Sequence, residues 1–265
     1  MICKSEDAKS IYFEVIGNLT SHKSLVFLNG LSQTTIAWGF MFPYFEQDYR
    51  IIVLDFIFQG QSEKTGDVRD FDQHARDVLS VLDTLSIEKA TFIGLSYGSL
   101  VAQHLGVNHP QRVDKLCLMS TFAHKTPYYE AIELSWRRAL DFGGYGLMLD
   151  VMLPFVLGTS YFSHPLIPIE LLKAARKDLV DASALGKLMD ATQARNDYRS
   201  SLTKIKAPTI VIHGRQDALF SVDLGKSVAD QIVTSQFVVI ENAGHTLNLE
   251  EVKLVSEKII KFLKK

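Results

Sequence analysis

Short apolar runs alternate along the chain with longer segments in which apolar residues recur at helical spacing. Runs of four or five apolar residues indicate buried strands, and recurrence about every 3.6 residues indicates helices. The strands that we predict lie at 25–28, 51–54, 90–93, 115–119, 209–212 and 237–240, with helices at 71–85 and 252–263. This alternation is typical of βαβ units and predicts an α/β fold with a mostly parallel sheet. The start differs, because 2–4 and 11–16 flank a polar turn and favour an antiparallel hairpin.

One region interrupts the alternation. From about residue 123 to 202 the pattern indicates helices without strands, and the region is too long for a loop. We therefore predict a core formed by 1–122 and 203–265, with 123–202 inserted as a helical lid over the carboxyl edge of the sheet.

The lid is rich in aromatic and large aliphatic residues, most of which we expect to pack against one another. The run 148–157 has more apolar side chains than one helical face can bury, so some should face the cleft beside 56–58. The pocket residues that we expect are Ser32, Phe58, Trp136, Met152 and Phe155. An apolar pocket of this kind predicts faster turnover of medium-chain acyl esters than of acetyl esters.

The composition is that of a globular protein. Hydrophobic residues make up 47% of the 265 residues, and the formal net charge is −2, so no basic excess favours nucleic acid or anionic lipid as a partner. The two cysteines, Cys3 and Cys117, predict neither a disulfide framework nor a metal site. The first residues lack the apolar run of a signal peptide, and Asp150 and Pro154 interrupt the most apolar stretch, 145–162. We expect a cytoplasmic protein without a membrane span.

The strongest motif is Gly94-Leu-Ser-Tyr-Gly98, which follows a predicted strand and precedes a helical run. In this context G-x-S-x-G predicts a nucleophile elbow with Ser96 at its tip. A serine at so sharp a turn takes a strained backbone conformation with positive φ. Side chains at 94 and 98 would collide in the turn, which explains a glycine at both places.

A serine hydroxyl needs a neighbouring base, and in this kind of fold the order along the chain is serine, acid, histidine. Asp217 and His245 each follow a predicted sheet strand, and they are 28 residues apart (245 − 217), one βαβ crossover. We predict that His245 is the base and that Asp217 orients it. Asp223 is an alternative acid, although it falls at the start of the next helix, and His213 closes a strand and is expected to be structural.

The oxyanion that develops during acyl transfer needs two backbone N–H donors. We predict Tyr97, the residue after the nucleophile, as one donor. The second should come from the loop after the strand 25–28, with Leu31 as first choice and Ser32 as second. Gly30 allows close approach of the backbone there.

Together these residues resemble the α/β-hydrolase superfamily over nearly the whole chain, and most of all its small lidded esterases and 3-oxoadipate enol-lactonase-like members. The resemblance is carried by 27–30, 94–98, 208–217 and 243–245. It implies the α/β-hydrolase fold, the Ser96–Asp217–His245 triad, no cofactor and no metal. The sequence departs from the superfamily at Asn29, where histidine is common, and at Ile57-Phe58, where Arg-Gly is common. The apolar variant at 57–58 resembles an acyltransferase of the same fold.

The function that we expect is hydrolysis of a carboxylic ester, lactone or thioester on a small-molecule acyl substrate, through an acyl-enzyme on Ser96. Two alternatives use the same triad: transfer of the acyl group to a hydroxyl acceptor, and hydrolysis of a C–C bond. The sequence leaves the acyl group and the oligomeric state open.

Overall fold

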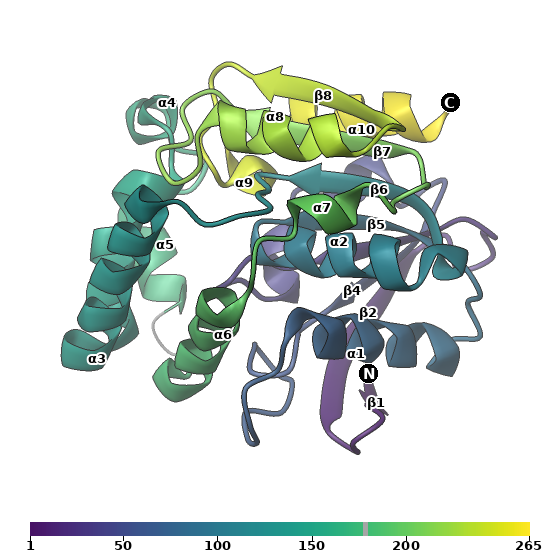
Figure 1. The fold of residues 1–265 in the computed structure, drawn as a ribbon, viewed down its shortest axis with the longest axis horizontal. Helices are drawn as coiled ribbons and strands as arrows, with labels where there is room; N and C mark the ends of the chain where they lie inside the picture. The colour runs from purple at the N-terminus through teal and green to yellow at the C-terminus, as the bar shows by residue number, and fades with distance from the viewer. Residues whose placement is uncertain (177–179) are drawn as a thin grey trace.

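The computed structural model describes residues 1–176 and 180–265, built around an eight-stranded sheet (Figure 1). Its strands are β1 (Ile2–Lys4), β2 (Ser10–Gly17), β3 (Ser24–Leu28), β4 (Arg50–Leu54), β5 (Ala90–Leu95), β6 (Val113–Met119), β7 (Thr209–Gly214) and β8 (Ser235–Ile240). Their order in the sheet is β1-β2-β4-β3-β5-β6-β7-β8. β2 pairs antiparallel with β1 and β4, and the pairs from β4 to β8 are parallel. The predicted α/β fold, its hairpin and its six later strands are confirmed.

Helices cover both faces of the sheet. They include α1 (Phe71–Thr84), α2 (Tyr97–Asn108), α8 (Val222–Gln231), the short α9 (Leu247–Glu250) and α10 (Val252–Leu263), with 3₁₀ turns η1 (Thr35–Trp38), η2 (Phe42–Tyr44) and η3 (Pro110–Arg112). Strand β3 contributes apolar side chains to the cores on both faces of the sheet. Its Val26 and Leu28 join the core under α1 and α2, whereas Leu25 and Phe27 join the core under η1 and α10. Because successive strand residues point to opposite faces, an unbroken apolar run is needed here.

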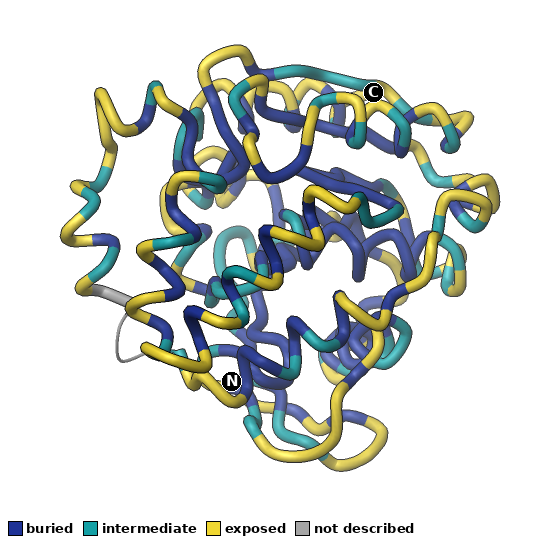
Figure 2. Tube along the Cα trace, turned by 60° about the vertical axis from the view of Figure 1, so that its left-hand side comes forward, coloured by how far each residue is buried: buried dark blue, intermediate teal, exposed yellow. Residues whose placement is uncertain are grey.

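The described residues between β6 and β7 form helices and no strand. These are α3 (Pro127–Val156), α4 (Thr159–Ser163), α5 (Ile169–Arg176), α6 (Ala182–Ala194) and α7 (Arg199–Leu202). Figure 1 shows α3, α5 and α6 together at one end of the sheet. In Figure 2 their outward surfaces are exposed, and the buried residues concentrate toward the sheet. This arrangement places the helical segment where it can cover the ends of strands.

Helix α3 differs from the expectation that Asp150 and Pro154 interrupt the apolar stretch. The helix continues through both residues, and by length and composition alone it is apolar enough to cross a membrane. It bends instead at Gly144, whose φ of 68° is left-handed. In the folded chain α3 packs against α6, and Asp150 forms an ion pair with Lys173 of α5 (2.6 Å). Part of the apolar surface of α3 is thus buried against the fold, whereas Leu134, Phe142 and Leu147 remain exposed.

Candidate active site

Ser96 lies at the turn between β5 and α2, in the middle of the sheet. Its φ is 51° and its ψ is −113°, a conformation that a non-glycine residue rarely adopts. A Cβ at Gly94 would lie 2.5 Å from the carbonyl oxygen of Gly98, and one at Gly98 would lie 2.1 Å from the carbonyl oxygen of Leu28. Both distances are much shorter than van der Waals contact. The steric reason for a glycine on each side of Ser96 is therefore confirmed.

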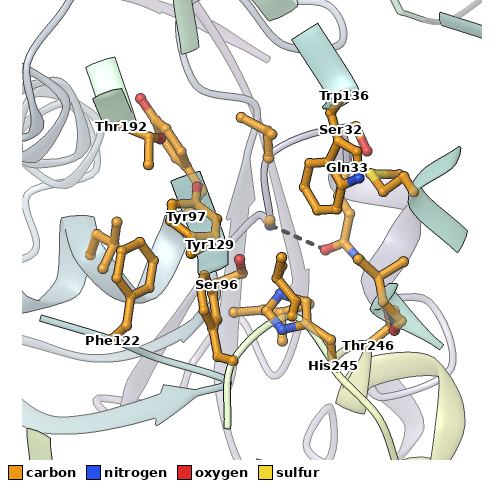
Figure 3. A pocket seen from close by; sticks show the side chains of 18 residues that line it. Ser32, Gln33, Ser96, Tyr97, Phe122, Tyr129, Trp136, Thr192, His245 and Thr246 are labelled. Atoms are coloured by element: carbon orange, nitrogen blue, oxygen red, sulfur yellow. Dashed lines mark hydrogen bonds between the residues drawn. The ribbon is translucent and has the colours of Figure 1, made fainter. Parts of the chain in front are cut away.

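The backbone of this turn is tied to the sheet. Ser96 N–H donates to the Met119 carbonyl (2.9 Å), and the Ser99 hydroxyl donates to the Ser96 carbonyl (2.5 Å). The Ser96 hydroxyl itself forms no hydrogen bond with any part of the chain that the structure describes. Ser96 and His245 line one pocket, and their side chains are turned into it (Figure 3). The turn thus holds an unengaged hydroxyl beside an imidazole ring.

Asp217 and His245 come together from the loops after β7 and β8. Asp217 Oδ2 lies 2.8 Å from His245 Nδ1, and both side chains are buried. The other carboxylate oxygen accepts the backbone N–H groups of Leu219 (2.9 Å) and Phe220 (2.8 Å). With Nδ1 engaged, the His245 ring is fixed so that Nε2 is free for chemistry in the pocket.

Electrostatics keep Asp217 ionised. Burial alone would raise its pKa, but His245 and His213 beside the carboxylate outweigh burial and hold the pKa well below its ordinary value. His213 is fully buried, and its Nε2 lies 2.9 Å from the Phe220 carbonyl and 3.3 Å from Asp217 Oδ2. His213 therefore packs behind the acid, in keeping with the structural role predicted for it. Asp223 lies exposed in the first turn of α8, and no hydrogen bond joins it to His245.

The two predicted oxyanion donors have free N–H groups. Neither Leu31 N nor Tyr97 N donates to another residue of the described chain. The carbonyls of Gly30 and Leu31 accept hydrogen bonds from Gln59 Nε2 (2.9 and 3.0 Å), and Gly30 N–H donates to Gln33 Oε1 (3.2 Å; dashed in Figure 3). These bonds hold the loop while leaving Leu31 N–H unengaged.

Asn29 occupies a position where the superfamily often has histidine, and its side chain anchors this loop. Its Nδ2 donates to the Leu54 carbonyl (2.9 Å), and its Oδ1 accepts the indole N–H of Trp38 (2.8 Å). All of these groups are buried, so the bonds compensate the desolvation of the amide. Asn29 therefore acts as a scaffold for the loop.

The loop that carries His245 is clamped by two further side chains that the sequence did not single out. The Glu250 carboxylate accepts the backbone N–H groups of Gly244 (2.8 Å), Thr246 (2.9 Å) and Gly158 (2.8 Å). The Ser120 hydroxyl donates to the His245 carbonyl (2.7 Å). Glu250 thus holds both neighbours of His245 and joins their loop to the chain just after α3. In the sequence, only the closeness of Glu250 to His245, five residues earlier, could have indicated this role.

The pocket at Ser96 is small, about 60 Å³, and mostly apolar. The structure places Ser32, Trp136 and Met152 in its lining, as expected. Its complete lining is Gly30, Leu31, Ser32, Gln33, Leu95, Ser96, Tyr97, Leu100, Phe122, Tyr129, Trp136, Met152, Val156, Thr192, Leu219, Phe220, His245 and Thr246. No lysine, arginine, aspartate or glutamate is among these described residues.

Contrary to the expectation, the structure places Phe58 and Phe155 outside this lining. The backbone at Phe58 has a φ of 80°, and the ring lies under the Lys187 ammonium, 5.0 Å from it, in a neighbouring crevice. On α3, Met152 and Val156 are one turn apart and face the pocket. Phe155 is rotated about 100° from Val156 around the helix axis, so it packs on the flank instead.

Glu133 of α3 lies behind the pocket wall, and its protonation makes the stability of the fold depend on pH. The hydroxyl of Tyr129, a wall residue, donates to Glu133 Oε1 (3.2 Å), and Glu133 is only 8% exposed. Burial raises the pKa of Glu133 from its ordinary 4.5 to about 7. The folded protein therefore holds a proton between these pH values that the unfolded chain releases. The contribution of Glu133 to stability is full below about pH 4.5 and falls as the pH rises toward 7.

Glu133→Gln should therefore change stability in a pH-dependent way. Glutamine resembles the protonated acid, so we expect the variant to gain about 1–3 kcal/mol over wild type at about pH 8 and almost nothing at about pH 4. Thermal unfolding of both proteins at the two pH values measures this difference. An equal shift at both pH values would show that Glu133 is not a buried, proton-binding group.

A family model described as the alpha/beta hydrolase fold matches residues 23–156. The chain is 31% identical to 3-oxoadipate enol-lactonase 2 of Acinetobacter baylyi, over 86% of this chain and 84% of that protein. It is 27% identical to the 2-hydroxymuconate semialdehyde hydrolase of Pseudomonas sp. strain CF600, over 85% and 80%. Among solved structures, the enol-lactonase of Burkholderia xenovorans LB400 superposes with a TM-score of 0.92 at 22% identity, covering 100% of both chains.

Proposed function

Because the chain belongs to the α/β-hydrolase family and several of its relatives are named as hydrolases or as an enol-lactonase, we propose that it is a serine hydrolase acting on a carboxylic ester, lactone or thioester. One observation carries the proposal: His245, bonded to the buried Asp217, shares a pocket with Ser96 at a strained turn. That combination is what nucleophilic catalysis by a serine requires.

In the proposed reaction, the Ser96 oxygen attacks the carbonyl carbon of the substrate while its proton passes to His245 Nε2. The Leu31 and Tyr97 N–H groups stabilise the oxyanion that forms. His245 then gives the proton to the leaving oxygen or sulfur as its bond to carbon breaks. Water, activated by His245 in the same way, cleaves the acyl-enzyme and releases the acid. Asp217 remains ionised and stabilises the imidazolium.

The helical segment would act as a lid. Trp136, Met152 and Val156 of α3 and Thr192 of α6 line the pocket opposite the sheet. They enclose the nucleophile in apolar surface, which strengthens the electrostatic interactions in the site. Because the described lining holds no lysine, arginine, aspartate or glutamate, the site favours an uncharged substrate.

The C–C bond hydrolases among the relatives are the second candidate. Several are named for substrates that carry carboxylates, such as the 2-hydroxy-6-oxononadienedioate hydrolase of Paraburkholderia phymatum, which is 27% identical to this chain. A buried carboxylate needs a cationic partner, and the described lining of this pocket offers no lysine or arginine. The acyltransferase alternative depended on the apolar 57–58 segment, and Phe58 lies outside the pocket. Both observations favour hydrolysis of a neutral ester.

Product analysis tests this proposal. With p-nitrophenyl acetate we expect release of free acetate, equally fast with and without EDTA, since in the described residues no group of three His, Cys, Asp or Glu could hold a metal. Adding an alcohol acceptor should leave acetate as the main product. If ester formed faster than free acid, the protein would be an acyltransferase. Loss of activity in EDTA, restored by a divalent ion, would contradict the serine mechanism.

A further inference from the structure

A second cavity, much larger than the pocket at Ser96, lies between the loop after β3 and helix α5. Its volume is about 430 Å³, within the range of about 300–1,000 Å³ usual for small-molecule sites. Its described lining is Ser32, Gln33, Thr34, Ile36, Ala37, Gly39, Phe40, Ile167, Leu171, Leu172, Val180, Asn248 and Leu249. The nucleophile pocket, at about 60 Å³, is too small to hold more than a short group.

The two spaces share a wall. Ser32 and Gln33 line both, directly after the predicted oxyanion donor Leu31. Asn248 and Leu249, on the far side of the cavity, follow His245 by three and four residues. Figure 3 shows Ser32 and Gln33 on the same side of Ser96 as His245, with Phe122 on the opposite side. The large cavity therefore adjoins the histidine side of the nucleophile.

The cavity is suited to an uncharged, apolar group. No charged side chain is among its described lining residues. Its two amide side chains are engaged with each other, Gln33 Nε2 donating to Asn248 Oδ1 (3.3 Å), and Asn248 also donates to the Ala37 carbonyl (3.0 Å). Around the opening, Ile36 is 74% exposed and Leu171 is 59% exposed. Exposed apolar side chains grouped at a cavity indicate an apolar ligand.

We propose that this cavity binds the leaving group of the substrate, an apolar alcohol or thiol, while the nucleophile pocket holds a short acyl group. The inference rests on the proposed function. His245 must protonate the leaving oxygen or sulfur as the carbon–heteroatom bond breaks, so the leaving group has to lie on the histidine side. The alcohol or thiol departs with that proton, and water later takes the acyl group from Ser96. The assignment differs from the medium-chain acyl group expected above, which relied on apolar side chains of 148–157 facing the cleft beside 56–58. Met152 and Val156 of that run do line the nucleophile pocket, but its volume of about 60 Å³ leaves room for only a short acyl group.

Two series of esters with matched carbon numbers test the proposal. The first keeps the acyl group as acetate and lengthens the alcohol from methyl to octyl. The second keeps methanol as the leaving group and lengthens the acyl chain. We expect kcat/KM to rise about tenfold for each four carbons added to the alcohol, with half of the transfer energy of each methylene realised. It should fall along the acyl series. The reverse pattern, or a flat response to alcohol length, would overturn the proposal.

Filling the cavity provides the second measurement. Ala37 lines the cavity and is half-buried, whereas Ala131 lies exposed on α3 and lines neither space. We expect Ala37→Phe to reduce kcat/KM for octyl acetate at least tenfold relative to methyl acetate, and Ala131→Phe to leave that ratio at the wild-type value. Equal ratios in the two variants would contradict the proposal.

Ser96→Ala separates this inference from the proposed function. If Ser96→Ala loses activity on every ester while the kcat/KM of the wild type does not depend on alcohol length, the serine mechanism stands and the leaving-group assignment fails. If the variant keeps its activity on both series, the proposed function itself fails, and the assignment of the cavity fails with it.

Discussion

Replacing Ser96 with alanine should reduce turnover of any ester substrate by about a million-fold, the cost typical of removing a catalytic nucleophile. The variant removes one oxygen, and the Ser96 hydroxyl forms no hydrogen bond with the described chain, so the fold loses no contact of that group. The glycines at 94 and 98, which make the turn possible, are unchanged. We therefore expect an inactive protein that is as stable as wild type to within about 1 kcal/mol.

The matched control is Ser200→Ala, which removes a hydroxyl from an exposed position on α7. It should retain wild-type kcat/KM. Circular dichroism and thermal unfolding establish that both variants are folded. Activity of Ser96→Ala within tenfold of wild type, in a preparation free of other esterases, would remove Ser96 from the mechanism.

Asp217→Asn should reduce turnover by about ten-thousand-fold, the second-largest effect that we expect. In the proposed mechanism, the carboxylate accepts a hydrogen bond from Nδ1 of His245 and leaves Nε2 free to receive the Ser96 proton. An amide in the same place can instead present its NH₂ group to Nδ1, which stabilises the wrong tautomer. The amide also carries no charge to stabilise the imidazolium in this buried site. The loss should fall on kcat rather than on KM, because Asp217 does not line the pocket.

Asp223→Asn is the control, since it makes the same chemical change on the exposed first turn of α8. We expect its kcat to stay within a factor of two of wild type. If Asp223→Asn were the damaging change and Asp217→Asn were mild, the acid of the site would have to be reassigned.

What the sequence predicted well depends on short-range geometry. The strands could be located because each buried run is apolar on both faces, as β3 shows with Leu25 and Phe27 on one side and Val26 on the other. The elbow could be located because it requires two glycines at fixed positions. A Cβ at either one would collide with backbone atoms a few residues away or in the adjacent strand β3. Asp217 and His245 follow neighbouring parallel strands, so their chain positions alone bring their loops together.

What the sequence could not predict depends on long-range packing. Glu250 clamps the His245 loop to Gly158, a residue 92 positions away. Phe58 and Phe155 are as apolar as the residues that do line the pocket, and only a local φ and a helical rotation direct them elsewhere. Pro154 stays within α3 although proline usually breaks a helix. The cavity between η1 and α5 is lined by the loop after β3, by α5 and by α9, which are far apart in the sequence.

If Ser96 is the nucleophile, it carries the acyl group during turnover. Rapid quenching of the protein in acid during its reaction with p-nitrophenyl acetate, followed by peptide mass spectrometry, identifies the residue that is acylated. We expect one added acetyl group on the peptide that contains Ser96, formed at least as fast as the steady-state rate and absent from Ser96→Ala. Acetyl transfer to another residue at a rate equal to turnover, or turnover without any acetylated peptide in either a rapid or a slow quench, would contradict that role of Ser96.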